Sequence, residues 1–98
     1  MNPINIWVSH DMLELSTGYL VSRKSDVAAL KQSLLALDFE TIENLIHKTK
    51  GTAGGYGFAE LGILAKALES AAKSKDPSKC RQCISEIESY LNLVEIKS

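Results

Sequence analysis

The chain has 98 residues, of which 45% are hydrophobic and 23% are charged, and its formal net charge is −1. This is the composition of one small globular domain, residues 1–98, and the near-neutral charge argues against a nucleic-acid partner. No apolar run approaches the roughly 18 residues that span a bilayer, and no signal-peptide pattern opens the chain. We therefore expect a cytoplasmic protein with no membrane partner.

Two amphipathic helices are predicted at the start of the chain, over residues 11–23 and 26–37. The first is a short, extra helix at the N-terminal end. Apolar residues recur in both at the spacing of one helix face. The inward-facing residues are expected to be Met12, Leu15, Tyr19, Val27, Leu30, Leu34 and Leu37.

A third helix is predicted to begin after Asp38, whose carboxylate suits an N-cap position, and to run through His47. Its apolar stripe should face the core. The stripe consists of Phe39, Ile42, Ile46, Thr49, Ala53 and Tyr56.

The residues allow two positions for the end of the third helix, because residues 51–57 contain four glycines. Each glycine inside a helix costs about 1 kcal/mol relative to alanine. Either the helix ends at Gly51 or Gly54, or it continues past Gly51 because a side chain there would obstruct a partner. The residues alone leave these alternatives about even. A loop must come by about Gly57, because the apolar stripe restarts out of phase at Leu61.

Two further helices complete the pattern. One face of the fourth carries Leu61, Leu64, Ala65, Leu68 and Ala72. Asp76 is then the N-cap and Pro77 the first residue of a last helix that runs to about Ile96. Cys80 and Cys83 fall on its apolar stripe, so we expect buried core thiols in a reducing compartment. Short connections favour antiparallel neighbours, so the fold class is all-α: an antiparallel up-down four-helix bundle with a short extra N-terminal helix.

His47 stands out because it should lie on the solvent side of the third helix, away from the apolar stripe. Lys50, Gly51 and Gly54 follow it at i+3, i+4 and i+7, on the same side of the helix. The helix therefore displays a histidine, a cation and a strip of bare backbone together. This combination indicates a site for a protein partner that must bring a reactive atom close.

Glu69 is expected to meet His47 across the hairpin of the third and fourth helices. His47 lies eleven residues before the turn and Glu69 eleven after it, so at about 1.5 Å per residue they stand at similar heights. A carboxylate there could accept a hydrogen bond from Nδ1–H of His47 and leave Nε2 as the free nucleophile. Lys50 could balance charge on whatever Nε2 acquires, and Lys66 and Lys73 would add positive potential.

The chain lacks a nucleotide-binding glycine loop, so a phosphoryl group on His47 would have to come from another protein's site. Its onward transfer would also need another protein. No carboxylate cluster suggests a magnesium cage, and the two histidines are far apart in sequence. We therefore expect no metal and no cofactor in this chain.

These residues resemble the histidine-containing phosphotransfer (HPt) domains of bacterial multistep phosphorelays. The pattern of that family runs His-x-Leu-Lys-Gly-small-Ala, then a glycine ten residues after the histidine, then Leu-x-x-x-x-x-x-Leu-Glu. The positions that match here are His47, Lys50, Gly51, Thr52, Ala53, Gly57, Leu61, Leu68 and Glu69. The similarity covers most of residues 11–75. Thr49 stands where leucine is usual, which bears on core packing rather than on chemistry.

The resemblance implies a four-helix bundle whose exposed histidine, here His47, takes a phosphoryl group from a receiver-domain aspartate and passes it to another receiver. It implies that Lys50 assists the phosphate, that Gly51 keeps the approach clear within an intact helix, and that Glu69 orients the ring. The partners would be receiver domains of a hybrid histidine kinase and of a response regulator, and these receivers would supply magnesium. The partner-binding surface is expected to include Gly51, Gly54, Lys48, Lys66 and Lys73.

Two other functions compete with this interpretation. A bundle of the same kind could be an adaptor that docks on receivers or other partners without phosphorylation, but the intact set of His47, Lys50 and Glu69 argues against it. A histidine-based hydrolase or metal protein would need a second catalytic or ligand cluster. A protein that accepts and passes on a phosphoryl group, but has no kinase or ATPase activity of its own, is an enzyme only in a loose sense of the word. The chain begins with Met1 and stops just after a helix, which favours an independent protein over a domain of a larger kinase. A protein that carries a phosphoryl group between two partners is expected to be a monomer.

Overall fold

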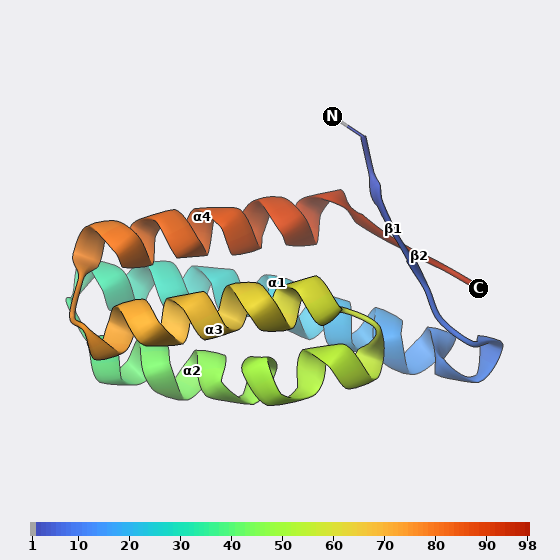
Figure 1. The fold of residues 1–98 in the computed structure, drawn as a ribbon, viewed down its shortest axis with the longest axis horizontal. Helices are drawn as coiled ribbons and strands as arrows, with labels where there is room; N and C mark the ends of the chain where they lie inside the picture. The colour runs from blue at the N-terminus through green and yellow to red at the C-terminus, as the bar shows by residue number, and fades with distance from the viewer. Residues whose placement is uncertain (1) are drawn as a thin grey trace.

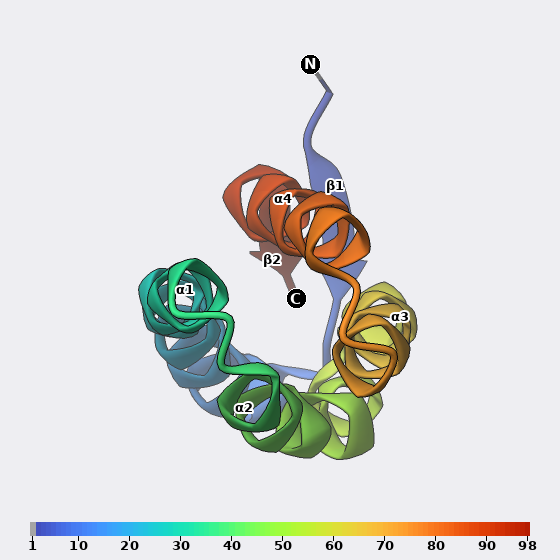
Figure 2. The same cartoon turned by 90° about the vertical axis from the view of Figure 1, so that its left-hand side faces the viewer.

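Four α-helices make up most of the structure, a computed structural model that describes residues 2–98. The helices are α1 (Leu13–Leu35), α2 (Phe39–Thr52), α3 (Ala59–Lys73) and α4 (Pro77–Leu93). Consecutive helices run in opposite directions along the long axis of the molecule (Figure 1). Viewed along that axis, the four helices surround a common centre, with α2 between α1 and α3 (Figure 2). None of the described helices is long and apolar enough to cross a membrane.

Side-chain caps begin two of the helices where the sequence predicts them. The carboxylate of Asp38 accepts a hydrogen bond from the backbone N–H of Thr41 at 3.1 Å, and α2 begins at the next residue. The carboxylate of Asp76 accepts one from the N–H of Lys79, also at 3.1 Å. Pro77 is the first residue of α4, where the missing N–H leaves no bond unmade. Both predicted N-caps are confirmed.

The two helices predicted over residues 11–23 and 26–37 are one continuous helix, α1, so the separate short N-terminal helix is wrong. Before α1 the chain makes only a single 3-10 turn, η1 (His10–Met12). Neither proline nor glycine separates the two predicted segments, and the helix runs through the residues between them.

Polar residues in the buried stripe of α1 explain why its continuity was missed. Ser16 is fully buried and Arg23 is half-buried, and both lie at helical spacing with Tyr19, Val27 and Leu30. A stripe judged by hydrophobicity alone breaks at the serine and at the arginine. Two residues that were expected to face inward are 58% exposed: Leu15 and Leu37.

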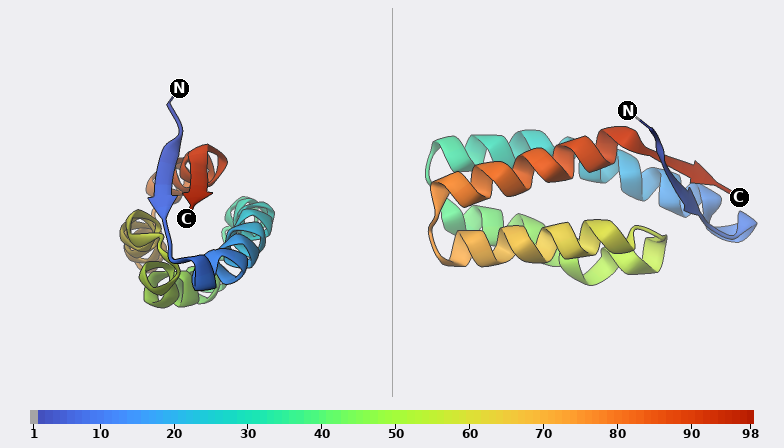
Figure 3. Two further views of the ribbon diagram at one scale, coloured as in Figure 1. Left: turned by 90° about the vertical axis from the view of Figure 1, so that its right-hand side faces the viewer. Right: turned by 45° about the horizontal axis from the view of Figure 1, so that its top comes forward.

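Two short strands, which the sequence did not predict, join the ends of the described chain. β1 (Ile4–Trp7) pairs in parallel with β2 (Val94–Lys97), and Ile6 lies opposite Ile96. The last helix therefore ends at Leu93, and its predicted continuation to Ile96 is wrong. Figure 3 shows the strands side by side at the end of the bundle where α1 begins and α4 ends. A strand of four residues is too short for its alternation of apolar and polar side chains to be detected in the sequence, and the partner strand is distant in sequence.

The glycine segment continues α2 before it turns. The α-helix passes Gly51 and ends at Thr52, and a 3-10 turn, η2 (Ala53–Tyr56), follows. Gly57 ends this turn with a φ of 97°, in the left-handed region that favours glycine. Of the two alternatives for this segment, the helix that passes Gly51 is correct, and the turn comes at Gly57 as predicted.

β1 and the residue after it pack against this turn. A Cβ atom built on Gly57 would lie 2.8 Å from Cγ1 of Val8 and 3.2 Å from Cγ2 of Ile6. Close approach and positive φ therefore both require glycine at this position. The contact fixes the turn that joins α2 to α3.

The core lies between the four helices and includes both cysteines. Cys80 and Cys83 are buried, free thiols on the inward face of α4, as the sequence predicts. Burial raises the pKa of both thiols. The largest fully buried side chains come from every helix and from the residue before α3, and they are Leu30, Ile42, Phe58, Leu61, Leu68 and Leu91.

Candidate functional site

His47 lies on the outer face of α2, and its side chain is 69% exposed. Gly51 and Gly54 follow it along the chain. A Cβ built on either glycine would meet no other group within 4 Å. Space, rather than packing, surrounds both positions, so nothing in the fold requires glycine there. The absence of a side chain at Gly51, one turn after His47 on α2, leaves the backbone there open to an approaching molecule, whereas Gly54 lies beyond the end of α2, in η2.

Glu69 reaches His47 from α3. Its Oε2 lies 2.7 Å from Nδ1 of the imidazole, across the packed pair α2 and α3. The two residues are 22 positions apart in sequence, and the antiparallel hairpin brings them to the same height. The carboxylate side chain is only 8% exposed, whereas the imidazole projects into solvent. Glu69 therefore holds one edge of the ring and leaves the other edge outside.

Two lysines share the second oxygen of the same carboxylate. Nζ of Lys50 lies 2.7 Å from Oε1 of Glu69, and Nζ of Lys73 lies 3.8 Å from it. The hydrogen bonds from Lys50 and then from His47 lower the pKa of Glu69 from its usual 4.5 to about 2. Burial opposes this effect but does not outweigh it. Glu69 is therefore ionised at neutral pH.

The ionised carboxylate fixes the tautomer of a neutral His47. A carboxylate only accepts hydrogen bonds, so Nδ1 must carry the proton that bridges to Oε2 of Glu69. In a neutral imidazole the other nitrogen then has a free lone pair. Nε2 is on the solvent side of the ring. The arrangement can present an exposed, oriented nitrogen nucleophile with two cations close by.

α1 supports the end of α2 through contacts that the sequence analysis missed. The hydroxyl of Ser16 donates to the carbonyl oxygen of Tyr56 at 2.8 Å. The hydroxyls of Tyr19 and Thr52 are also 2.8 Å apart, and the rings of Tyr19 and Tyr56 stack with centroids 4.3 Å apart. Thr52 in turn donates to the carbonyl oxygen of Lys48. Ser16 gives no signal in the sequence, because a serine inside a helix is ordinarily solvent-facing.

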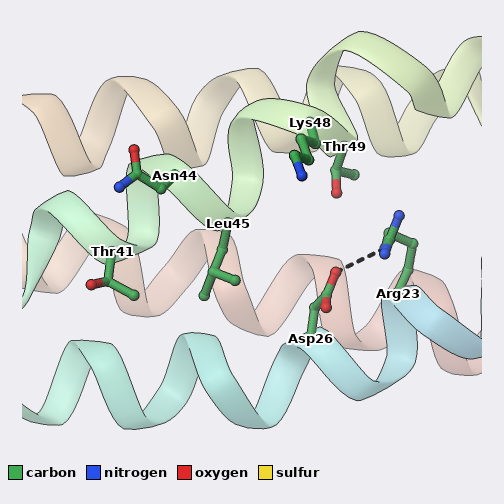
Figure 4. A pocket seen from close by; sticks show the side chains of 7 residues that line it. All are labelled: Arg23, Asp26, Thr41, Asn44, Leu45, Lys48 and Thr49. Carbon is green, nitrogen blue, oxygen red and sulfur yellow. Dashed lines mark ion pairs between the residues drawn. The ribbon is translucent and has the colours of Figure 1, made fainter.

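A groove of about 460 Å³ lies beside the site, between α1 and α2 (Figure 4). Arg23 and Asp26 form an ion pair of 2.8 Å on the α1 side, and Arg23 also lies over the ring of Tyr19, 4.7 Å from its centroid. Lys48 lines the opposite side. The groove is lined by Arg23, Asp26, Thr41, Asn44, Leu45, Lys48 and Thr49.

The remaining predicted residues are dispersed around His47. Lys66 is exposed on α3, one turn before Glu69, and no ion pair joins it to another residue within the described part of the chain. Lys48 lies in the groove and not beside Glu69. Among residues 2–98, no group of three or more histidine, cysteine, aspartate or glutamate side chains could hold a metal ion.

Comparison with known proteins identifies the family. No match to the chain was found among curated proteins or among solved structures. The family model of the Hpt domain matches residues 14–96, which is most of the chain and includes all four helices except the first residue of α1. Hpt domains carry out histidine phosphotransfer in phosphorelays, where they interact with receiver domains. The chain, with its helical bundle and its exposed histidine, belongs to the Hpt domain family.

Proposed function

We propose that this protein is a phosphocarrier in which Nε2 of His47 accepts a phosphoryl group from a receiver-domain aspartate and passes it to a second receiver. One observation carries the proposal. Oε2 of Glu69 lies 2.7 Å from Nδ1 of an exposed imidazole, so in the neutral ring the free lone pair is on Nε2. The partners are receivers of a hybrid histidine kinase and of a response regulator.

The transfer is an in-line displacement at phosphorus. The lone pair of Nε2 forms the P–N bond while the P–O bond to the receiver aspartate breaks, and the aspartate leaves as a carboxylate. The proton stays on Nδ1 of His47, where Glu69 stabilises the positive charge that the ring acquires. Transfer to the second receiver is the reverse of this step. The receiver supplies magnesium, and this chain contributes no cofactor.

The surroundings of His47 suit a protein donor. Gly51 and Gly54 present no side chain, so the receiver's reactive carboxylate can come close to the ring. Lys50, Lys66 and Lys73 lie on α2 and α3 around His47, and their positive charge favours docking of an acidic receiver site. Lys48 adds its charge at the groove between α1 and α2. We propose that the protein works as a cytoplasmic monomer and has no kinase activity of its own.

Labelling with phosphoramidate tests the proposal without a partner. We expect the wild type to gain one acid-labile phosphoryl group, seen by intact mass and phosphorus NMR, and His47→Gln to gain none. His10→Gln is the matched control, because His10 is exposed and lies in η1, before the first helix. It should be labelled like the wild type. A folded wild type that stays unmodified would favour a non-phosphorylated adaptor that docks on receivers or other partners. Equal labelling of His47→Gln would show that His47 is not the reactive group.

The role of the bare backbone needs a separate test. Gly51→Leu should leave labelling by phosphoramidate intact, because the reagent is small. Transfer from a panel of phosphorylated receivers should fall at least tenfold, since a Leu side chain would stand where the receiver approaches. Equal transfer by Gly51→Leu and wild type would show that Gly51 is not part of the docking surface.

A further inference from the structure

Three nitrogens compete for one carboxylate in this site. Oε2 of Glu69 is occupied by His47, and Oε1 is shared unequally by Lys50 at 2.7 Å and Lys73 at 3.8 Å. Lys50 is 34% exposed, whereas Lys73 is 64% exposed. The nearer lysine is therefore bound to Glu69, and the farther one is held loosely at the edge of the site.

Phosphorylation of His47 would add negative charge close to Lys50 and would therefore affect the ion pairs of Glu69. The phosphoryl group brings up to two negative charges to Nε2, on the solvent side of the ring. Lys50 is the cation one turn away that can neutralise them, but in the described structure it is hydrogen-bonded to Glu69. If Lys50 left without replacement, Oε1 would be a buried and charged oxygen with no partner, which is costly.

We propose that Lys73 replaces Lys50 on Oε1 of Glu69 when Lys50 turns to the phosphoryl group. Lys73 is thus a positioning residue: it keeps Glu69 paired, and Glu69 keeps the ring of His47 oriented. This inference rests on the proposed function. It assigns Lys73 a specific role inside the site, whereas the sequence predicted only that it adds positive potential and belongs to the partner-binding surface.

The geometry suits such an exchange. Lys73 is four residues after Glu69, so both project from the same face of α3. Its Nζ needs to move by only about 1 Å to reach the length of a charged hydrogen bond. Its exposed side chain has no other ion-pair partner among the residues that the structure describes. Lys66 lies on the same helix but makes no ion pair with Glu69, so it is not equipped for this role.

A double-mutant cycle on phosphoramidate labelling tests the proposal. The rate of labelling and the lifetime of the phosphohistidine would be measured for Lys50→Ala, Lys73→Ala and the double variant. We expect Lys73→Ala to lower the rate about fivefold, equivalent to about 1 kcal/mol for an exposed ion pair. We expect Lys50→Ala to lower it at least as much. The double variant should be no slower than Lys50→Ala, because without Lys50 the pairing of Oε1 of Glu69 does not change on phosphorylation and Lys73 has no exchange to support.

Two further variants separate pairing from general positive charge. Lys66→Ala removes the same charge from the same helix, and Lys73→Ala should have at least three times its effect. Lys73→Arg keeps both charge and reach, so it should restore most of the rate. In every variant, nitrogen NMR of the unphosphorylated protein should still show the proton on Nδ1 of His47, since the resting contact with Glu69 persists.

Each other outcome has a definite meaning. Equal losses in Lys73→Ala and Lys66→Ala, or losses that multiply in the double variant, would overturn the exchange and leave Lys73 as one contributor to a diffuse field. These results require that the wild type is labelled. If no variant and no wild type is labelled at His47, the proposed function itself fails, and the exchange fails with it.

Discussion

Replacing Gly57 by alanine should destabilise the protein by an amount that can be worked out from two features of the turn. The φ of 97° lies in the left-handed region, which costs an L-residue about 1–2 kcal/mol. The added Cβ would also lie 2.8 Å from Cγ1 of Val8, and overpacking of this kind costs about 1–3 kcal/mol. Relaxation of the β1 segment removes part of the second cost. We expect a loss of about 2–4 kcal/mol in the free energy of unfolding.

Urea unfolding followed by circular dichroism measures this loss. Gly55→Ala is the matched control, because Gly55 lies two residues earlier, has no positive φ and has open space around its Cα. It should stay within about 0.5 kcal/mol of the wild type, as surface substitutions usually do. A Gly57→Ala protein that is as stable as the wild type would refute the reasoning. Equal losses in both variants would show that any side chain in this segment is harmful, whatever its φ.

Three other predictions follow from contacts around the site and in the core. The wild type should lose stability as the pH falls from 4.5 towards about 2, because the ionised carboxylate of Glu69 stabilises the fold and is protonated over this interval. When unfolding is measured at each pH, Glu69→Gln should lose less stability over the same interval. Tyr19→Phe should cost about 1 kcal/mol in urea unfolding through the lost hydrogen bond to Thr52, and a cost below about 0.3 kcal/mol would mean that water replaces it. Cys80 and Cys83 should react with a thiol reagent only as fast as the protein unfolds, and rapid reaction in native buffer would contradict their burial.

The contact between His47 and Glu69 could be predicted from the sequence because both positions depend on local spacing. The positions of His47 and Lys50 follow from one helix period, and Glu69 follows from counting equal lengths on both sides of one turn. Such counting holds when the two helices are neighbours in sequence and are joined by a short turn, here η2 and the residues after it. The structure places Glu69 against the imidazole as this count expects. It also shows that Lys50 is bound to the carboxylate, which spacing could not reveal.

The parts of the fold that were missed depend on non-local contacts. Ser16 is buried only because the carbonyl oxygen of Tyr56 is there to accept its hydrogen bond. Without knowledge of that partner, the polar residue breaks the apolar stripe and divides α1 in two. The pairing of β1 with β2 joins residues from the two ends of the described chain, so no short window of sequence contains it. Helix caps, in contrast, lie within three residues of what they bind and were predicted correctly.

The parallel pairing of β1 with β2 also bears on the order in which the molecule folds. Ile4 pairs with Val94, so the sheet closes a loop of about 90 residues. Most helix packing is more local, since α2 packs on α1 and α3, and α3 on α4, although α1 also packs on α4. Closing a loop of that length costs conformational entropy, and the few strand contacts offset this cost only after the helices have brought the two ends together. The sheet should therefore form last. Its amides should then exchange with solvent faster than those of the buried helices. Because Ile6 and Val8 lie against Gly57, each opening of the sheet uncovers the turn between α2 and α3 while the helices remain folded.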